Sequence, residues 1–338
     1  MDQQKTLKEW KPVNPAFDPN EPMQVGGQAV IEGVMMRAKG MIATAVRRPN
    51  GTIAVRKEAF HSLAERYPLF KLPVLRGAVG LIEMMYIGIK TLNYSAEVAL
   101  DESPVGEEKT GAETSEGSVL SLTATLLVAL GLGIAIFFFL PLFIATRLFR
   151  IEQQPLLFNL AAGAIRIALL LGYLYSISLM KDVRRLFQYH GAEHKAVFTF
   201  EQNAALDVPS AMKFTRFHPR CGTSFVLLVM FVSIFLFSIL DVAVLFAVGS
   251  LTLPLRLATH IPCIPIVGGI SYEVLRFSAK HASTRLGKIL VAPGLWLQTI
   301  TTNEPDETQM EVALVAIRAA LRLDMKDAVR DTAAVAAI

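Results

Sequence analysis

The residues best suited to chemistry are three histidines, a glutamate and a cysteine between positions 181 and 222. His190, Glu193 and His194 form an H-x-x-E-H pattern, and on a helix residues at i, i+3 and i+4 share one face. In zinc hydrolases with the inverted motif, two such histidines bind the metal and the glutamate acts as general base on water. The pattern therefore predicts a divalent metal, most simply Zn²⁺, with Glu193 as the catalytic residue.

His218 and Cys221 add two further candidate metal ligands. They lie three residues apart, a spacing that a turn can bring onto one ion. If these two join His190 and His194, the site is closed and structural, whereas three ligands leave a position open to water and permit catalysis. The sequence leaves both alternatives open. Cys221 as a nucleophile activated by a histidine is a weaker alternative, because nothing else supports a cysteine hydrolase.

Five more charged residues in apolar surroundings are candidate site residues, namely Glu32, Arg37, Glu273, Arg166 and Arg256. An unpaired carboxylate would be costly in the strand-like stretch around Glu32, so we expect it to pair with Arg37 or another cation. Charged groups within apolar spans usually form ion pairs inside the bundle, and lining of a polar cavity is the alternative.

The elements that position these residues are membrane helices. The chain has 338 residues, of which 53% are hydrophobic and 18% charged, so an ordinary soluble protein is excluded. Spans are predicted at 119–146, 156–180 and 223–240. The apolar run 242–274 would be roughly 50 Å long as one helix, so we expect it to break at Pro254, Pro262, Pro265, Gly268 or Gly269.

The distribution of basic residues predicts the orientation. Residues 1–118, 181–222 and 276–338 hold 29 of the 33 Lys and Arg residues, and such segments face the cytoplasm. We therefore expect about four spans in the inner membrane, both termini in the cytoplasm and a cytoplasm-facing site. The net charge of +4 is too small and too one-sided to indicate a nucleic-acid partner.

The predicted fold is a membrane α-helical bundle, its last span broken, with a cytoplasmic α+β portion containing a β-hairpin. The hairpin is expected around Asn50-Gly51, between alternating residues 41–46 and 53–55. The predicted domains are a disordered N-terminus (1–24), a β-rich element with a membrane-associated helix (25–100), an acidic linker (101–118), two spans (119–180), the cytoplasmic loop with the His/Glu/Cys cluster (181–222), a further transmembrane region (223–275) and a cytoplasmic segment (276–338) with an amphipathic helix that begins after Pro305.

Several motifs together resemble the bacterial YqhQ family, a domain of unknown function (1385) often described as a predicted metal-dependent enzyme. The resemblance runs from Val25 to Leu321 and rests on segments 26–37 (GGQAVIEGVMMR), 189–195 (YHGAEHK), 218–224 (HPRCGTS), 270–273 (ISYE) and 301–306 (TTNEPD). It implies a metal-dependent enzyme with a site made from the same His, Glu and Cys residues.

Two functions of different classes fit these features. The first is a cytoplasm-facing metal-dependent hydrolase, whose position at the bilayer predicts a lipid-linked or membrane-protein substrate. The second is a non-catalytic scaffold in membrane-protein biogenesis, in which a structural metal holds the 181–222 segment and the C-terminal amphipathic helix binds a cytoplasmic protein partner. A transporter is a weaker third choice, because four spans leave room for a pathway only in a homo-oligomer.

Overall fold

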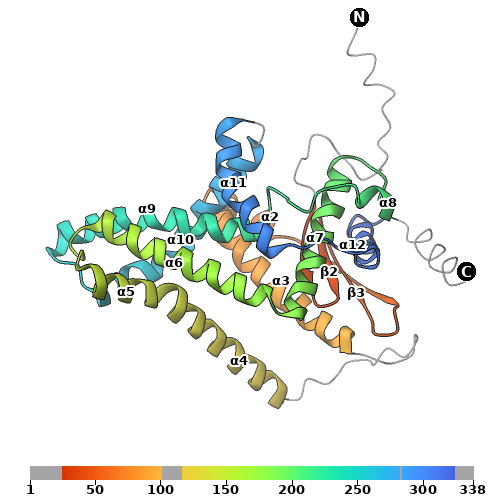
Figure 1. The fold of residues 1–338 in the computed structure, drawn as a ribbon, viewed down its shortest axis with the longest axis horizontal. Coiled ribbons are helices and arrows are strands. Elements are labelled where there is room, and N and C mark those ends of the chain that lie inside the picture. Colours follow the sequence, from red (N-terminus) through yellow and green to blue (C-terminus); the bar gives the residue numbers. More distant parts are fainter. Residues whose placement is uncertain (1–24, 101–115, 282–283, 324–338) are drawn as a thin grey trace, which may run out of the picture.

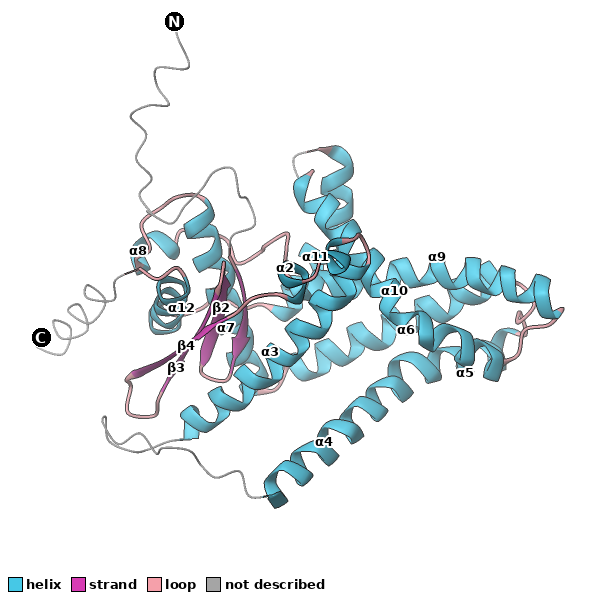
Figure 2. Cartoon of the chain, turned by 180° about the vertical axis from the view of Figure 1, so that it is seen from behind, coloured by secondary structure: helices cyan, strands magenta, loops and turns pink. Residues whose placement is uncertain are grey.

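The computed structural model describes residues 25–100, 116–281 and 284–323, and has two parts joined by helix α3 (Leu75–Leu100). Long helices lie together on one side, and a small sheet with helices α7 and α12 lies on the other (Figure 1, Figure 2). The predicted disordered N-terminus and residues 101–115 of the predicted acidic linker lie outside the described residues, as do residues 324–338.

Four antiparallel strands form the sheet in sequence order: β1 (Gly26–Val30), β2 (Gly33–Ala38), β3 (Met41–Arg47) and β4 (Ile53–Ala59). The predicted hairpin is confirmed, since β3 pairs with β4 across Asn50-Gly51. The stretch around Glu32 is not one strand. Glu32 has φ 51° and forms the turn between β1 and β2, so its carboxylate lies at the sheet edge instead of inside a strand.

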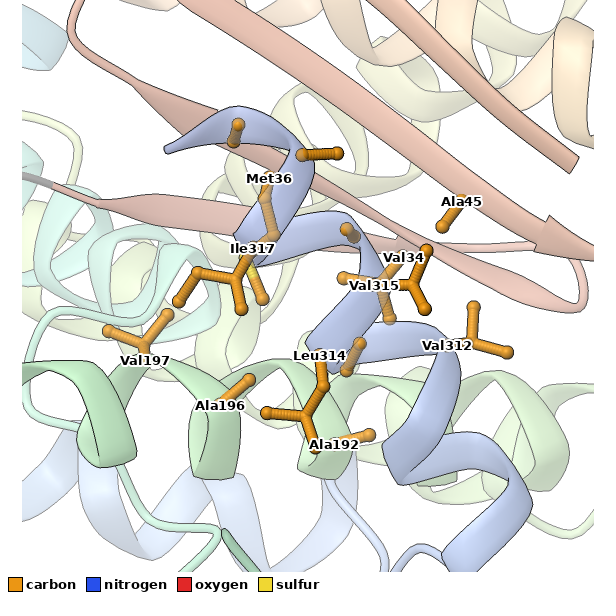
Figure 3. Packing of buried hydrophobic residues seen from close by; sticks show 14 of the residues in the cluster. Val34, Met36, Ala45, Ala192, Ala196, Val197, Val312, Leu314, Val315 and Ile317 are labelled. Atoms are coloured by element: carbon orange, nitrogen blue, oxygen red, sulfur yellow. The ribbon is translucent and has the colours of Figure 1, made fainter. Parts of the chain in front are cut away.

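Helix α12 (Glu307–Ala320) covers one face of the sheet. It begins at a capping box in which Asp306 accepts from the backbone N–H of Gln309, as the sequence after Pro305 predicts. Figure 3 shows its apolar side chains between Val34, Met36 and Ala45 of the sheet and Ala196 of helix α7 (Lys181–Glu201). The amphipathic helix is therefore confirmed, and its partner surface belongs to the same chain.

Among the described residues, four helical stretches are long and apolar enough to cross a membrane, namely Leu127–Phe149, Pro155–Ser178, Gly222–Val248 and Leu253–Ser278. These stretches indicate a membrane protein. The first consists of α4 (Glu116–Ile134), the π-helical η2 (Ala135–Phe139) and α5 (Leu140–Phe149), and the others are α6 (Pro155–Ser178), α9 (Gly222–Val248) and most of α10 (Leu253–Lys280).

The predicted broken span is wrong, because the apolar run divides elsewhere. Helix α9 extends to Val248 and ends at Gly249, whose φ of 80° favours glycine. Helix α10 then runs through Pro262 and Pro265 without interruption. A proline removes only one backbone donor, and neighbouring helices within a membrane tolerate this loss.

The remaining helices are short or belong to the C-terminal segment. Segment 181–222, expected as a loop, consists largely of α7 and the short α8 (Val208–Ala211). Between β4 and α3 lie α2 (Leu63–Arg66) and the 3₁₀ turn η1 (Pro68–Lys71), and α11 (Arg285–Thr301) precedes α12.

Candidate metal centre

Helix α7 carries the H-x-x-E-H residues on the face that meets the rest of the protein. Its C-terminal half is buried because β1 and α12 pack against it. The backbone N–H of Asn303 donates to the carbonyl of Phe187 (2.8 Å), which holds the segment after α11 beside this helix. Ligands on α7 therefore meet groups from α11 and from the start of α9.

His190 and His194 are each oriented by a backbone carbonyl. Nδ1 of His190 lies 2.8 Å from the carbonyl oxygen of Thr301, and Nδ1 of His194 lies 2.5 Å from that of Arg216. A carbonyl can only accept, so both Nδ1 atoms carry the proton and both Nε2 atoms have a free lone pair. Burial lowers the pKa of both imidazoles, which favours this neutral form. This is how proteins orient histidines that bind metals.

Cys221 completes a group of three ligand atoms. It is buried at the N-cap of α9, and its Sγ lies 3.2 Å from Nε2 of His190. One ligand atom from each of His190, His194 and Cys221 lies within 4.8 Å of the others. Ligand atoms on one tetrahedral zinc are roughly 3.3–3.6 Å apart, so small side-chain rotations would make the group fit the ion. His194 Nε2 is buried with no hydrogen-bond partner in the described part of the chain.

His218 does not join this group, contrary to the four-ligand alternative. Its Nε2 faces Glu201 Oε2 at 3.3 Å, and its Nδ1 accepts from the backbone N–H of Arg220. Its ring lies beside that of His194, with 5.6 Å between the centroids. Glu201 also pairs with Arg220. The structure therefore brings three of the four predicted ligands together and places His218 next to them.

Glu193 lies against the ligand group without being part of it. Its side chain is 7% exposed, and Oε2 is 3.5 Å from Nε2 of His194. Burial raises the pKa of this carboxyl, while His190 and a hydrogen bond from the Gly27 backbone lower it. Gly27 must lack a side chain, because a Cβ there would lie 2.5 Å from the Met35 carbonyl oxygen and 2.9 Å from Glu193 Cγ. The sequence motif contained Gly27, but nothing in it pointed to this contact.

A cavity of about 570 Å³ opens beside the ligand group. It lies between α7, α3, α10 and the end of the sheet that holds the start of β1 and the β2–β3 turn, and the ligand residues and Glu193 form part of its wall. Its other charged lining residues are Arg37, Lys39, Glu65 and Arg220, and its large apolar or aromatic ones include Phe60, Met84 and Tyr272. A molecule in this cavity could reach both the ligand atoms and Glu193.

Glu32 pairs with a cation, as expected, but that cation is not Arg37. Glu32 pairs with Arg185 of α7 and accepts from the Tyr189 hydroxyl at 3.3 Å. Arg37 on β2 points its guanidinium over the Phe60 ring, 4.5 Å from the centroid, within the cavity wall. The turn at Glu32 accounts for the difference, because it places the carboxylate at the end of the hairpin opposite Arg37.

The other predicted polar residues lie outside the ligand group. Glu273 on α10 pairs with Arg76 of α3, which joins the apolar helices to the sheet part. Arg166 donates to the Phe137 carbonyl and to Ser233 Oγ, each at 3.0 Å. Arg256 lies 3.4 Å from Asp241. Ion pairing within the protein is thus confirmed for Glu273 and Arg256, whereas Arg166 uses neutral acceptors.

Comparison with known proteins places the chain in a family. The family described as "Protein of unknown function (DUF1385)" matches residues 72–323. The chain belongs to this family. It is also 36% identical over 311 residues to the "Uncharacterized protein YqhQ" of Bacillus subtilis (strain 168), which covers 90% of this chain and 94% of the relative. No solved structure matches the chain significantly.

The family match spans the ligand group and the residues beside it. His190, His194 and Cys221 lie within 72–323, as do Glu193 and His218, whereas the sheet with Gly27 and Arg37 precedes this range. The alignment with the B. subtilis protein covers most of the chain, as the motifs in the sequence predict. Neither description assigns an activity.

Proposed function

We propose that this protein is a metal-dependent hydrolase of the inner membrane with its site on the cytoplasmic side. One observation carries the proposal: His190 and His194 each donate Nδ1–H to a backbone carbonyl and leave Nε2 facing Cys221 Sγ beside a cavity. Two histidines and a cysteine are a ligand set of catalytic zinc sites that leaves one position open.

The roles of the protein's own residues follow from their positions. A bound Zn²⁺ would supply Lewis acidity and a more acidic water molecule. Glu193 lies close enough to His194 Nε2 to accept a proton from water in the cavity. The carbonyls of Thr301 and Arg216 keep the two imidazoles in the tautomer that binds metal. His218 holds Glu201 away from the ligands.

The membrane location also supports the choice of substrate. The cavity is lined by Tyr272 of the apolar helix α10 and by Met84 of α3. Segment 181–222, which supplies the ligands, holds seven of the basic residues that favour a cytoplasmic position. A lipid-linked substrate or a membrane protein could therefore reach the site from the inner leaflet.

The first experiment measures zinc in full-length protein purified in detergent without chelators or a histidine tag. We expect about one zinc per chain in the wild type and none in the double variant His190→Ala, His194→Ala. Glu193→Gln should keep its zinc, as should the control Glu97→Gln, since Glu97 is exposed on α3 away from the ligand group. Folded wild-type protein without metal would refute the proposal.

The second experiment separates an enzyme from a scaffold. Hydrolysis of p-nitrophenyl acetate by the zinc form should fall about 100-fold or more in Glu193→Gln, in line with the loss of a general base, and should not change in Glu97→Gln. A zinc-loaded wild type that hydrolyses nothing, or a Glu193→Gln variant as active as wild type, would favour the scaffold with a structural metal. The scaffold also needs another partner surface, because α12 is buried in the protein's own core.

A further inference from the structure

Arg37 has an unusual environment for a half-buried arginine. Its guanidinium lies over the Phe60 ring and donates to Met84 Sδ at 3.3 Å, and within the described ranges no carboxylate pairs with it. A thioether is a weak acceptor, whereas a guanidinium offers five N–H donors in a fork that matches phosphate and carboxylate. Most of the donor capacity of Arg37 is therefore unused, and it faces the cavity.

Three other arginines, two from the sheet and one from α7, have carboxylate partners. Arg47 pairs with Glu311 at 2.6 Å, Arg56 with Glu58 at 2.5 Å and Arg185 with Glu32. Arg56 is the closest match to Arg37, since it also comes from a strand and lies over an aromatic ring, that of Tyr94, at 5.2 Å. Arg37 differs in lining the cavity and in lacking an anion.

Helix α3 lines the cavity through Met84 and has an apolar face that points away from the rest of the protein. Its protein-facing residues include Glu83, Thr91 and Ser95, which hydrogen-bond to Ser62, Gln28 and Ile31. Its opposite face exposes apolar side chains in helical spacing, namely Ile82 (63%), Met85 (62%), Tyr86 (68%) and Leu92 (43%). A helix on a soluble domain shows the opposite arrangement, with its apolar face toward the protein and its polar face toward water. The arrangement on α3 suits contact with acyl chains, and α3 also packs on the candidate span α10.

We infer that the cavity binds a membrane-embedded amphiphile with a phosphate head group, and that Arg37 holds the phosphate. Three cations, Arg37, Lys39 and Arg220, line the cavity against two acids, Glu65 and Glu193, and this net charge of +1 suits an anionic head group. The apolar part lies along Met84 toward the exposed face of α3. The inference depends on the proposed function in one respect only, namely that the bond to be hydrolysed lies at the ligand group.

The test measures equilibrium binding of dihexanoyl phosphatidic acid to full-length protein in detergent. Arg37→Gln should weaken binding by roughly 10- to 100-fold, as expected for a lost charged hydrogen bond. Arg56→Gln, the matched control, should bind as the wild type does, and Arg37→Lys should be intermediate because it keeps charge without the fork. Dihexanoylglycerol and inorganic phosphate, each tested alone, should both bind more weakly than the phosphatidic acid.

Each other result overturns a defined part of the inference. Equal binding by wild type and Arg37→Gln would refute the role of Arg37, and inorganic phosphate binding as tightly as the lipid would refute a membrane-embedded ligand. Repeating the comparison in the His190→Ala, His194→Ala background excludes an effect through the metal, since direct binding predicts the same Arg37-dependent difference there. If the protein contains zinc but does not bind phosphatidic acid, only this inference is refuted. If it shows Arg37-dependent binding but contains no zinc, only the proposed hydrolase is refuted.

Discussion

In the part of the chain that the structure describes, two buried clusters contain histidine, and they differ in what the ring nitrogens face. In the ligand group, backbone carbonyls orient His190 and His194, and their Nε2 atoms stay available. Between helices α6, α9 and α10, the fully buried His260 instead directs Nε2 to Asp241 at 2.9 Å. A carbonyl on Nδ1 leaves Nε2 of His190 and His194 able to bind a metal ion, whereas Asp241 takes up Nε2 of His260.

The carboxylate of Asp241 takes its partners from within its own cluster. Asp241 also accepts from Asn159 Nδ2 at 2.7 Å, and Arg256 donates to the Glu152 carbonyl at 2.6 Å. His260 stacks on Phe237 with 4.1 Å between the centroids, and Arg256 covers the Phe158 ring. The cluster joins three apolar helices, where each charge depends on an opposite one nearby. Burial of histidine alone therefore does not indicate a metal site.

His194 and His260 should differ in their contribution to metal binding. We expect His194→Ala to lose its zinc, a loss greater than the roughly 10- to 100-fold reduction in affinity from removing an outer partner. His260→Ala should retain one zinc per chain, because His260 does not approach the ligand group. Plasma mass spectrometry on both purified variants measures this difference. Zinc loss from His260→Ala with His194→Ala unaffected would reverse our assignment.

Substitutions in the Asp241 cluster should mainly lower the stability of the protein. Asp241→Asn leaves Arg256 buried without a counter-charge, which costs about 3–5 kcal/mol. The double variant Asp241→Asn, Arg256→Gln should lose less than the sum of the two single losses, because both charges are removed together. Thermal unfolding in detergent, with zinc measured on the folded fraction, checks both statements. A loss below about 1 kcal/mol would show that the pair behaves like an exposed one.

Two neighbouring glycines beside the ligand group, Gly26 and Gly27, differ in the space available for a side chain. A Cβ at Gly27 would overlap the Met35 carbonyl and Glu193, so Gly27→Ala should cost about 1–3 kcal/mol and disturb Glu193. Gly26→Ala should be nearly neutral, since a Cβ there meets nothing within 4 Å. Thermal unfolding of the two variants gives the difference. Equal stability would mean that the sheet can move away from α7 without cost.

Local spacing predicted the part of the site that depends on local structure. His190 and His194 share a face because they are four residues apart on one helix, whatever the rest of the fold does. The carbonyls of Thr301 and Arg216 could not be predicted, since every residue has a carbonyl and no side-chain type marks these two. The sequence could not decide whether His218 joins the ligand group, because its ring direction depends on a loop and on Glu201, which no spacing rule relates to it.

The fold was likewise predictable where it depends on local sequence and not where it depends on packing. Apolar length predicted the candidate spans, and the capping residues after Pro305 predicted α12. The sequence did not show that Pro262 and Pro265 stay within one helix, because packing against neighbouring helices decides whether a proline interrupts a helix. Nor did it show that Glu32 forms a turn, because alternating residues on both sides concealed the reversal.

The position of α12 in the chain has a consequence for biosynthesis. The ribosome makes strands β1 to β4 before any candidate span, and makes the helix that covers them after the last one. Until then the apolar face of the sheet, with Val34, Met36 and Ala45, lacks its cover, which exposes a nascent chain to aggregation or to chaperones. Thr301, whose carbonyl orients His190, is also made after all four spans. Membrane insertion therefore precedes the formation of the ligand group, and a chain released too early would carry both histidines of the motif without a site.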